Sequence, residues 1–246
     1  AEMTTTQIRE RVAVFAEAAR FMKSVGFDAI EIHFGHGYGI SQFISPKTNK
    51  RKDAYGGSLT NRMRFALEVL AAVRGAVGED MPLFGKISMT DGVEGGVTYA
   101  DSIEIARLLE QGGIDVIICS GGTSSFNPML LFRGKNIRDG IMRQQKSAFM
   151  RLGVRLAGGM LFKDYPYEEL FFLEHARRIR ETVKCGVCYI GGAATGESFR
   201  TVMSEGFDFI QLGRALLYDP DLPKHAEADR DYVNGCSHCN ECAVLI

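Results

Sequence analysis

Residues 27–65 read FDAIEIHFGHGYGISQFISPKTNKRKDAYGGSLTNRMRF, and this stretch decides the fold. It starts as an apolar strand and ends inside a helix. Between the two lie His33, His36 and Tyr38, followed by a Gly-Gly turn. Polar side chains gathered just past the carboxyl end of a strand are typical of the active face of an α/β enzyme. The stretch therefore predicts an enzyme built from β-α units.

The same alternation of strand and helix continues along the chain. The opening helix starts at a capping box formed by Thr4 and Gln7, and it stops at Gly26. The predicted strands cover residues 27–34, 83–89, 114–120, 187–191 and 207–213, and the later helices cover 59–76, 99–111, 167–183 and 197–205. The strands are apolar throughout, which predicts a parallel sheet covered on both faces. Right-handed crossovers repeated in one direction close such a sheet into a TIM (β/α)8 barrel.

The length of the chain agrees with a single domain. Its 246 residues match one barrel of about 250 residues, and no linker or low-complexity tract divides it, so we expect residues 1–246 to form one domain. A closed barrel of this type has eight strands, and the sequence predicts only five, so we expect a partial barrel. The segment 121–166 is too long for an ordinary connection, so we expect it to form a lid over the active face.

Composition limits the partners. The chain holds 29 basic and 30 acidic residues, and this balance favours a small-molecule substrate over nucleic acid or an anionic membrane. No apolar run is long enough to span a bilayer, and the N-terminus lacks the apolar core of a signal peptide. Reduced cysteines in the predicted strands, Cys119, Cys185 and Cys188, agree with a cytoplasmic location. The sequence does not decide whether the protein forms a homo-oligomer.

Several motifs in order resemble the signature of the old yellow enzyme family of FMN-dependent oxidoreductases. They are the opening stretch, Lys86 on the next strand, SGG at 120–122, YIGG at 189–192, QLGRALL at 211–217 and the closing CSHCNEC. In that family the fold is a TIM barrel, and FMN passes hydride from NADH or NADPH to the C=C bond of an α,β-unsaturated carbonyl compound. The resemblance implies that the five strands are strands 4–8 of such a barrel, and we expect the chain to be the C-terminal portion of a longer protein.

The resemblance assigns substrate binding to His33 and His36. Two neutral imidazoles directed at one point can donate hydrogen bonds to a carbonyl oxygen, which polarises the conjugated double bond. From the residues alone, the histidines could instead bind a metal or serve the structure. Tyr38 matches the family's proton donor, since a protonated phenol can act as a general acid. A buried structural tyrosine is its alternative.

Cofactor binding is implied for two further regions. Lys86 stands where the family usually has an arginine directed at the edge of the flavin, and a cation there stabilises the anionic reduced flavin. From its place inside the barrel, we expect Lys86 to have no acidic partner. Gly191, Gly192, Gly213 and Arg214 end the last two strands, where TIM barrels bind phosphate through backbone N–H groups.

The closing motif places Cys236, Cys239 and Cys242 at the spacing of iron–sulfur ligands. One branch of the family holds a [4Fe–4S] cluster with such a trio and a fourth cysteine. The sequence ends without that fourth cysteine, and His238 stands where an apolar residue is expected. We therefore rank no metal in this chain first, a cluster in a longer parent second, and zinc bound by the cysteines and His238 third.

Two other functions remain as alternatives. One is another FMN barrel, such as a dihydroorotate-type dehydrogenase, which would share the phosphate loops without requiring the histidines and Tyr38 together. The other is a catalytically inactive barrel fragment with a structural role. Bound flavin would separate an enzyme from an inactive fragment.

Overall fold

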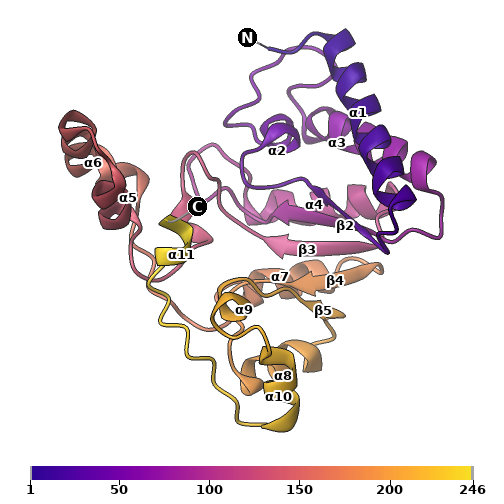
Figure 1. The fold of residues 1–246 in the computed structure, drawn as a ribbon. Helices are drawn as coiled ribbons and strands as arrows, with labels where there is room; N and C mark the ends of the chain where they lie inside the picture. The colour runs from indigo at the N-terminus through magenta and orange to yellow at the C-terminus, as the bar shows by residue number, and fades with distance from the viewer. Residues whose placement is uncertain (1, 245–246) are drawn as a thin grey trace.

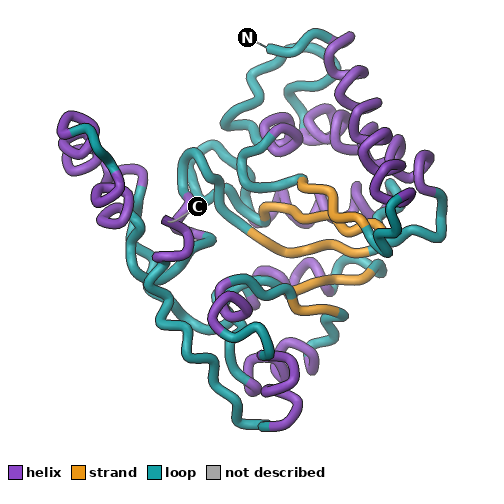
Figure 2. The backbone as a smooth tube through the Cα atoms, viewed as in Figure 1, coloured by secondary structure: helices purple, strands orange, loops and turns teal. Residues whose placement is uncertain are grey.

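The computed structural model describes residues 2–244, and its centre is a five-stranded parallel sheet (Figures 1 and 2). The strand order follows the sequence: β1 (Ile30–His33), β2 (Leu83–Ser88), β3 (Val116–Ser120), β4 (Gly186–Tyr189) and β5 (Phe209–Ile210). All four neighbouring pairs are parallel. The predicted strands are therefore confirmed, although every one is shorter than the apolar run that predicted it.

Helices cover the convex face of the sheet. They are α1 (Thr5–Ser24), α3 (Leu59–Val77), α4 (Tyr99–Gln111), α7 (Leu173–Arg180) and α8 (Gly196–Ser204). Thr4 caps α1 in the predicted capping box, and Ser58 caps α3 by accepting a hydrogen bond from the Asn61 N–H. The main apolar core lies between these helices and the sheet, with Leu83, Ile117 and other strand residues fully buried.

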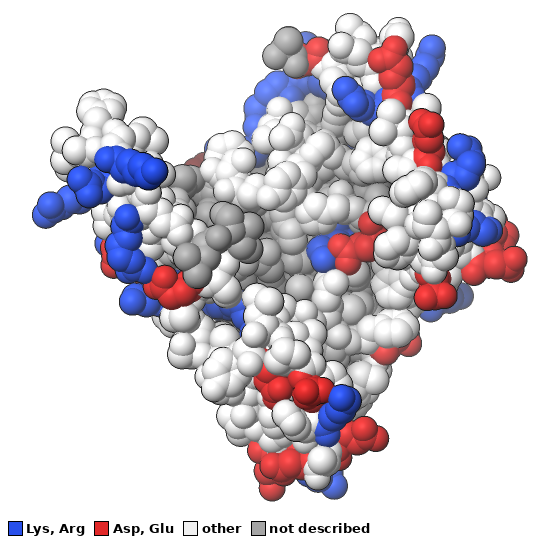
Figure 3. Space-filling model, in the orientation of Figure 1, with Lys and Arg blue, Asp and Glu red and all other residues white. Residues whose placement is uncertain are grey.

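The other face of the sheet is concave, and no helix within residues 2–244 packs on it, so the expected cover is found on one face only. Figure 3 shows this face as a hollow lined mostly by uncharged side chains. Near the hollow, the Gln211 side chain donates a hydrogen bond to Glu31 Oε2 over 3.1 Å. Gln211 follows β5 and Glu31 lies on β1, so the contact joins the two outer strands across the concave face. The sheet is therefore curved as in part of a barrel.

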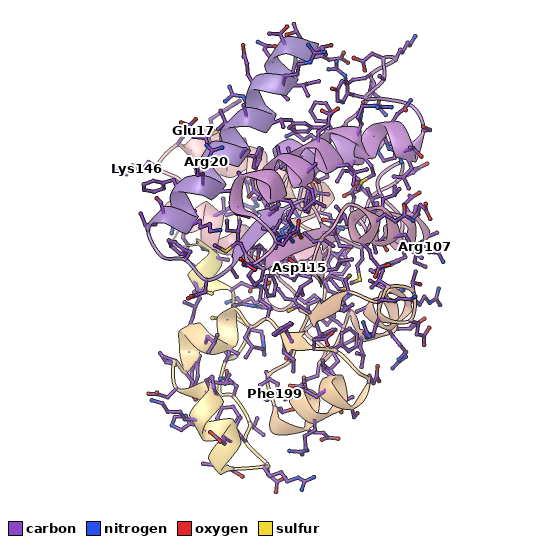
Figure 4. The ribbon with its side chains drawn as sticks, turned by 90° about the vertical axis from the view of Figure 1, so that its right-hand side faces the viewer. Glu17, Arg20, Arg107, Asp115, Lys146 and Phe199 are labelled. Atoms are coloured by element: carbon purple, nitrogen blue, oxygen red, sulfur yellow. The ribbon has the colours of Figure 1, made fainter. Side chains whose placement is uncertain are left out.

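Charged contacts hold the opposite end of the sheet together. Asp115, labelled in Figure 4, precedes β3, and its carboxylate accepts hydrogen bonds from the Arg74 guanidinium of α3 and from the Leu83 N–H at the start of β2. One side chain thus ties a helix to two strands at the amino-terminal edge. No helix within residues 2–244 combines the length and the apolar content needed to cross a membrane.

The sequence analysis missed several helices. These are α2 (Gly39–Ile44), η1 (Pro128–Leu130), α5 (Arg138–Gln144), α6 (Ala148–Leu161), α9 (Arg214–Tyr218), α10 (Leu222–Ala228) and α11 (Glu241–Val244). All of them are short except α6. The first part of the predicted lid, residues 121–132, lies beside Tyr38. The following α5–α6 hairpin instead projects from the body (Figure 1), so only part of the segment lies over the active face.

Candidate active site

The carboxyl end of β1 brings three predicted residues together. His33 is the last residue of β1, and its ring centroid lies 4.8 Å from that of His36 and 5.6 Å from that of Tyr38. The side chains belong to one turn that ends in α2, for which Tyr38 is the N-cap residue. The turn thus presents two imidazoles and a phenol at one edge of the sheet.

The backbone at His36 adopts an uncommon conformation. Its φ of 61° lies in the left-handed region, which non-glycine residues rarely occupy. Three hydrogen bonds hold it there: the His36 N–H donates to Ser88 Oγ over 2.9 Å, and its carbonyl accepts from the Ser124 N–H and hydroxyl, each over 3.0 Å. Strain held by surrounding contacts in this way is frequent at functional sites.

Both histidines are neutral at pH 7. Burial, together with the nearby His33 and Lys86, lowers the pKa of His36 to about 3. Burial also lowers the pKa of His33, with a further contribution from Lys86. His36 Nε2 lies 2.8 Å from the hydroxyl of the fully buried Ser120, and this contact holds the ring in place. No pattern in the sequence identified Ser120 or Ser88 as partners of the histidine turn.

Tyr38 is open to solvent. Its side chain is 56% exposed, so the alternative of a buried structural tyrosine is wrong. Tyr38 and His36 line a cavity of about 130 Å³, whose other walls come from residues 121–124, 128 and 131–132. A phenol at the wall of a cavity can donate its proton to a molecule bound there.

Lys86 has an acidic partner, contrary to expectation. Its ammonium lies 2.7 Å from Glu31 Oε1, and Glu31 also accepts from Gln211. The strand register explains the pair, because His33 aligns with Lys86 and Glu31 with Phe84, two positions that share the concave face. Lys86 therefore lies beside the histidines, but its positive charge is already balanced.

A second cavity of about 170 Å³ lies at the ends of β4 and β5. Gly191, Gly192, Gly213 and Arg214 all line it, so the structure brings the four predicted residues together. Among residues 2–244, none of their backbone N–H groups donates to an acceptor. A Cβ atom on Gly213 would meet nothing within 4 Å, so this glycine borders open space, whereas a Cβ atom on Gly191 or Gly192 would come within 3 Å of Phe172 or Phe171.

Arg214 also has a structural role. Its Nη1 donates to the Arg133 carbonyl over 2.7 Å and to Asn240 Oδ1 over 2.6 Å. The Asn240 amide in turn donates to the carbonyls of Phe132 and Lys135. The arginine thus joins the start of α9 to the long loop and to the C-terminal segment.

The three C-terminal cysteines differ in exposure. Cys236 and Cys242 are half-buried and Cys239 is exposed. His238 stacks on Tyr167 with ring centroids 3.3 Å apart, and burial lowers the pKa of His238 to about 4. Within the described part of the chain, no three His, Cys, Asp or Glu side chains are grouped as metal ligands, so the zinc arrangement considered above is not formed there.

A cavity of about 570 Å³ lies beside α2 and contains none of the predicted site residues. Its buried polar groups are already paired. Asp91 accepts from the Ser45 hydroxyl and the Val97 N–H, and the Asn49 amide donates to the carbonyls of Phe43 and Tyr55. Groups satisfied in this way serve the loop structure, and we do not assign the active site there.

Comparison with known proteins identifies the family. A sequence model of the NADH:flavin oxidoreductase / NADH oxidase family matches residues 1–124, which is half of the chain. The chain belongs to this family. It is 37% identical over 245 residues to a 4,4'-dithiodibutanoate disulfide reductase from Rhodococcus erythropolis, covering 99% of this chain and 60% of that protein. It is 40% identical over 227 residues to an NADPH dehydrogenase from Bacillus velezensis, covering 92% of this chain and 56% of that protein.

A solved structure is similar in fold. A 2-naphthoyl-CoA reductase bound to 2-naphthoyl-CoA matches with a TM-score of 0.76 and 27% identity, over 98% of this chain and 32% of that one. An old yellow enzyme homologue from Zymomonas mobilis has the same fold, with a TM-score of 0.65 and 21% identity over 96% of this chain and 57% of that one. The five-stranded sheet is therefore part of a TIM barrel of the old yellow enzyme type. The chain spans roughly three fifths or less of each of these relatives.

Membership of the NADH:flavin oxidoreductase family implies a flavin and a nicotinamide reductant. The cavity at the ends of β4 and β5 fits a flavin phosphate, because unpaired N–H groups, open space at Gly213 and a guanidinium meet there. At Lys86 the fit is weaker, since Glu31 places a negative charge beside the cation. Gly191, Gly192, Gly213 and Arg214 would hold the phosphate of the cofactor, and Lys86 is a weaker candidate for a contact with its ring.

Proposed function

We propose that the complete protein is an FMN-dependent NAD(P)H oxidoreductase that reduces the C=C bond of α,β-unsaturated carbonyl compounds. One observation carries the proposal: two neutral imidazoles and an exposed phenol meet at the carboxyl end of β1. Neutral imidazoles donate hydrogen bonds without bringing a full positive charge to the site. Family membership supports the redox cofactor but leaves the acceptor open.

The roles follow from the chemistry of each side chain. His33 and His36 donate hydrogen bonds to the carbonyl oxygen, where negative charge develops as the β-carbon accepts hydride. The Ser120 hydroxyl holds the ring of His36 through its contact with Nε2. Tyr38 donates a proton to the α-carbon, so that hydride and proton together saturate the double bond. Arg214 with Gly191, Gly192 and Gly213 would hold the phosphate of FMN, which when bound would supply hydride taken from NADH or NADPH.

A second candidate is reduction of a disulfide, the reaction named for the Rhodococcus relative. Cleavage of an S–S bond by two electrons yields thiolates and requires no protonation at carbon. The two candidates therefore differ in their need for Tyr38. Tyr38→Phe should slow reduction of an enone strongly and reduction of 4,4'-dithiodibutanoate little.

Half-reaction kinetics of the complete protein test the main proposal. Replacing His33 and His36 by Ala should slow oxidation of the reduced flavin by an enone on the order of 10²-fold or more, as loss of an oxyanion donor does. Reduction of the flavin by nicotinamide should barely change. Stopped-flow traces with an equal loss in both halves would refute the assignment.

A further inference from the structure

The α5–α6 hairpin exposes an apolar helix face. In α6, a helix of 14 residues, Phe149 is 82% exposed, Leu156 is 77% exposed and Leu152 is 52% exposed. Their spacing of three and four residues places them on one side of the helix. The opposite side packs on α5, where Gly158 lies close to the side chain of Arg138. A surface helix of a globular protein normally buries its apolar side, and α6 leaves it in solvent.

The same segment concentrates positive charge. Residues 133–163 contain eight Lys or Arg side chains and one Asp, a formal net charge of +7, although the whole chain has a net charge of −1. The remaining residues therefore carry −8. Two of the eight Lys and Arg side chains are paired with carboxylates outside the segment, Arg133 with Glu168 and Arg143 with Glu241. Lys146, Arg151 and Arg155 are exposed and form no ion pair within residues 2–244. Figure 3 shows the projecting lobe with several Lys and Arg side chains beside an uncharged tip.

We propose that α6 docks on a membrane surface that contains anionic lipids. The apolar residues Phe149, Leu152 and Leu156 would enter the boundary between headgroups and acyl chains, while Arg151 and Arg155 bind lipid phosphates. An exposed apolar face and a flanking basic set are the two features that such binding combines. The whole chain has a net charge near zero because its acidic remainder balances this basic segment. The overall charge therefore argued against an anionic membrane although one segment is basic.

Other occupants fit less well. In an isologous contact between two copies of this chain, the same segment would face itself, and the exposed side chains of Lys146, Arg151 and Arg155 would repel those of the second copy. A nucleic acid would match the charge but would leave Phe149 and Leu156 in water. A membrane surface satisfies both features.

Vesicle sedimentation of the complete protein tests the proposal. Vesicles of phosphatidylcholine with phosphatidylglycerol should retain the protein, and vesicles of phosphatidylcholine alone should not. Arg151→Glu with Arg155→Glu should weaken binding on the order of 10-fold or more, and Leu152→Asp with Leu156→Asp should abolish it. Matched controls are Arg20→Glu with Arg107→Glu, at exposed positions of α1 and α4 labelled in Figure 4, and Val14→Asp, at a half-exposed apolar position of α1. The controls should bind as the wild type does.

Circular dichroism and the thermal transition verify that each variant is folded. Equal binding to neutral and anionic vesicles, or unchanged binding of both α6 double variants, would overturn the proposal. The absence of binding to anionic vesicles would also overturn it, and self-association that the leucine variants abolish would then show that a second copy covers α6.

Discussion

Arg214→Ala should weaken both folding and FMN binding in the complete protein, and the structure separates the two effects. The substitution removes two hydrogen bonds from Nη1, to the Arg133 carbonyl and to Asn240 Oδ1. Hydrogen bonds from a charged donor contribute about 1.5–3 kcal/mol, and each acceptor left buried and unpaired costs about 1–3 kcal/mol. Because these effects are not additive, we expect the free energy of unfolding to fall by about 2–3 kcal/mol. Loss of the contact to phosphate should raise the dissociation constant for FMN roughly 10- to 100-fold.

Asn240→Ala provides the matched control. It removes the same contact to Arg214 and two further hydrogen bonds to Phe132 and Lys135, but it keeps the guanidinium. We expect a loss of stability at least as large as that of Arg214→Ala, with a dissociation constant for FMN within about threefold of the wild type. Urea unfolding measures the first quantity, and fluorescence titration of apo-protein with FMN measures the second. An unchanged FMN affinity in Arg214→Ala, or an equal loss in both variants, would refute the phosphate role of Arg214.

Three further predictions concern the active site and the sheet. Tyr38→Phe should slow oxidation of the reduced flavin by an enone roughly 10²-fold or more without slowing its reduction, and equal slowing in both half-reactions would contradict a proton-donor role. The pKa of His36 is about 3 in the folded state, below the ordinary histidine value of about 6.5. Between pH 3 and pH 6.5 the unfolded chain therefore binds more protons than the folded chain, and the free energy of unfolding should fall as the pH drops through this range. His36→Asn, which tolerates the left-handed backbone, should flatten that dependence in urea unfolding, and a slope equal to that of the wild type would show that another group causes it. Residues 1–246 expressed alone should give helical circular dichroism, but the protein should be colourless and should aggregate or dimerise. Within residues 2–244, β1 pairs only with β2 and β5 only with β4, so both edges of the sheet are open. A yellow, monodisperse monomer would contradict this prediction.

Local patterns in the sequence predicted the strands, the long helices and the histidine turn. Each depends on neighbouring residues: continuous apolar runs, capping residues and the position of polar groups just after a strand. The helix predicted for residues 167–183 was too long, since α7 spans only Leu173–Arg180. Leu170 has a left-handed φ of 56°, and its N–H donates to the Gly192 carbonyl. A contact to a distant strand end overrode the helical pattern there.

The pairing of charges at the site depended on strand register. Glu31 and Lys86 are both visible in the sequence, but their contact follows from β1 lying beside β2 with His33 opposite Lys86. Arg214 was expected at a phosphate site, and the structure adds its bonds to Arg133 and Asn240. The dual role could not be read from one motif.

The sequence by itself determined that β-α units alternate and that two histidines and a tyrosine follow one strand, because these features arise within a few residues. Only the tertiary structure decided which groups act on them. Ser88 and Ser120 lie on two other strands, 52 and 84 residues from His36, and become its partners because parallel strands end at a common edge. The tertiary structure also separated α6 from the body and left its apolar side in solvent, since packing against other elements decides whether an amphipathic helix is buried.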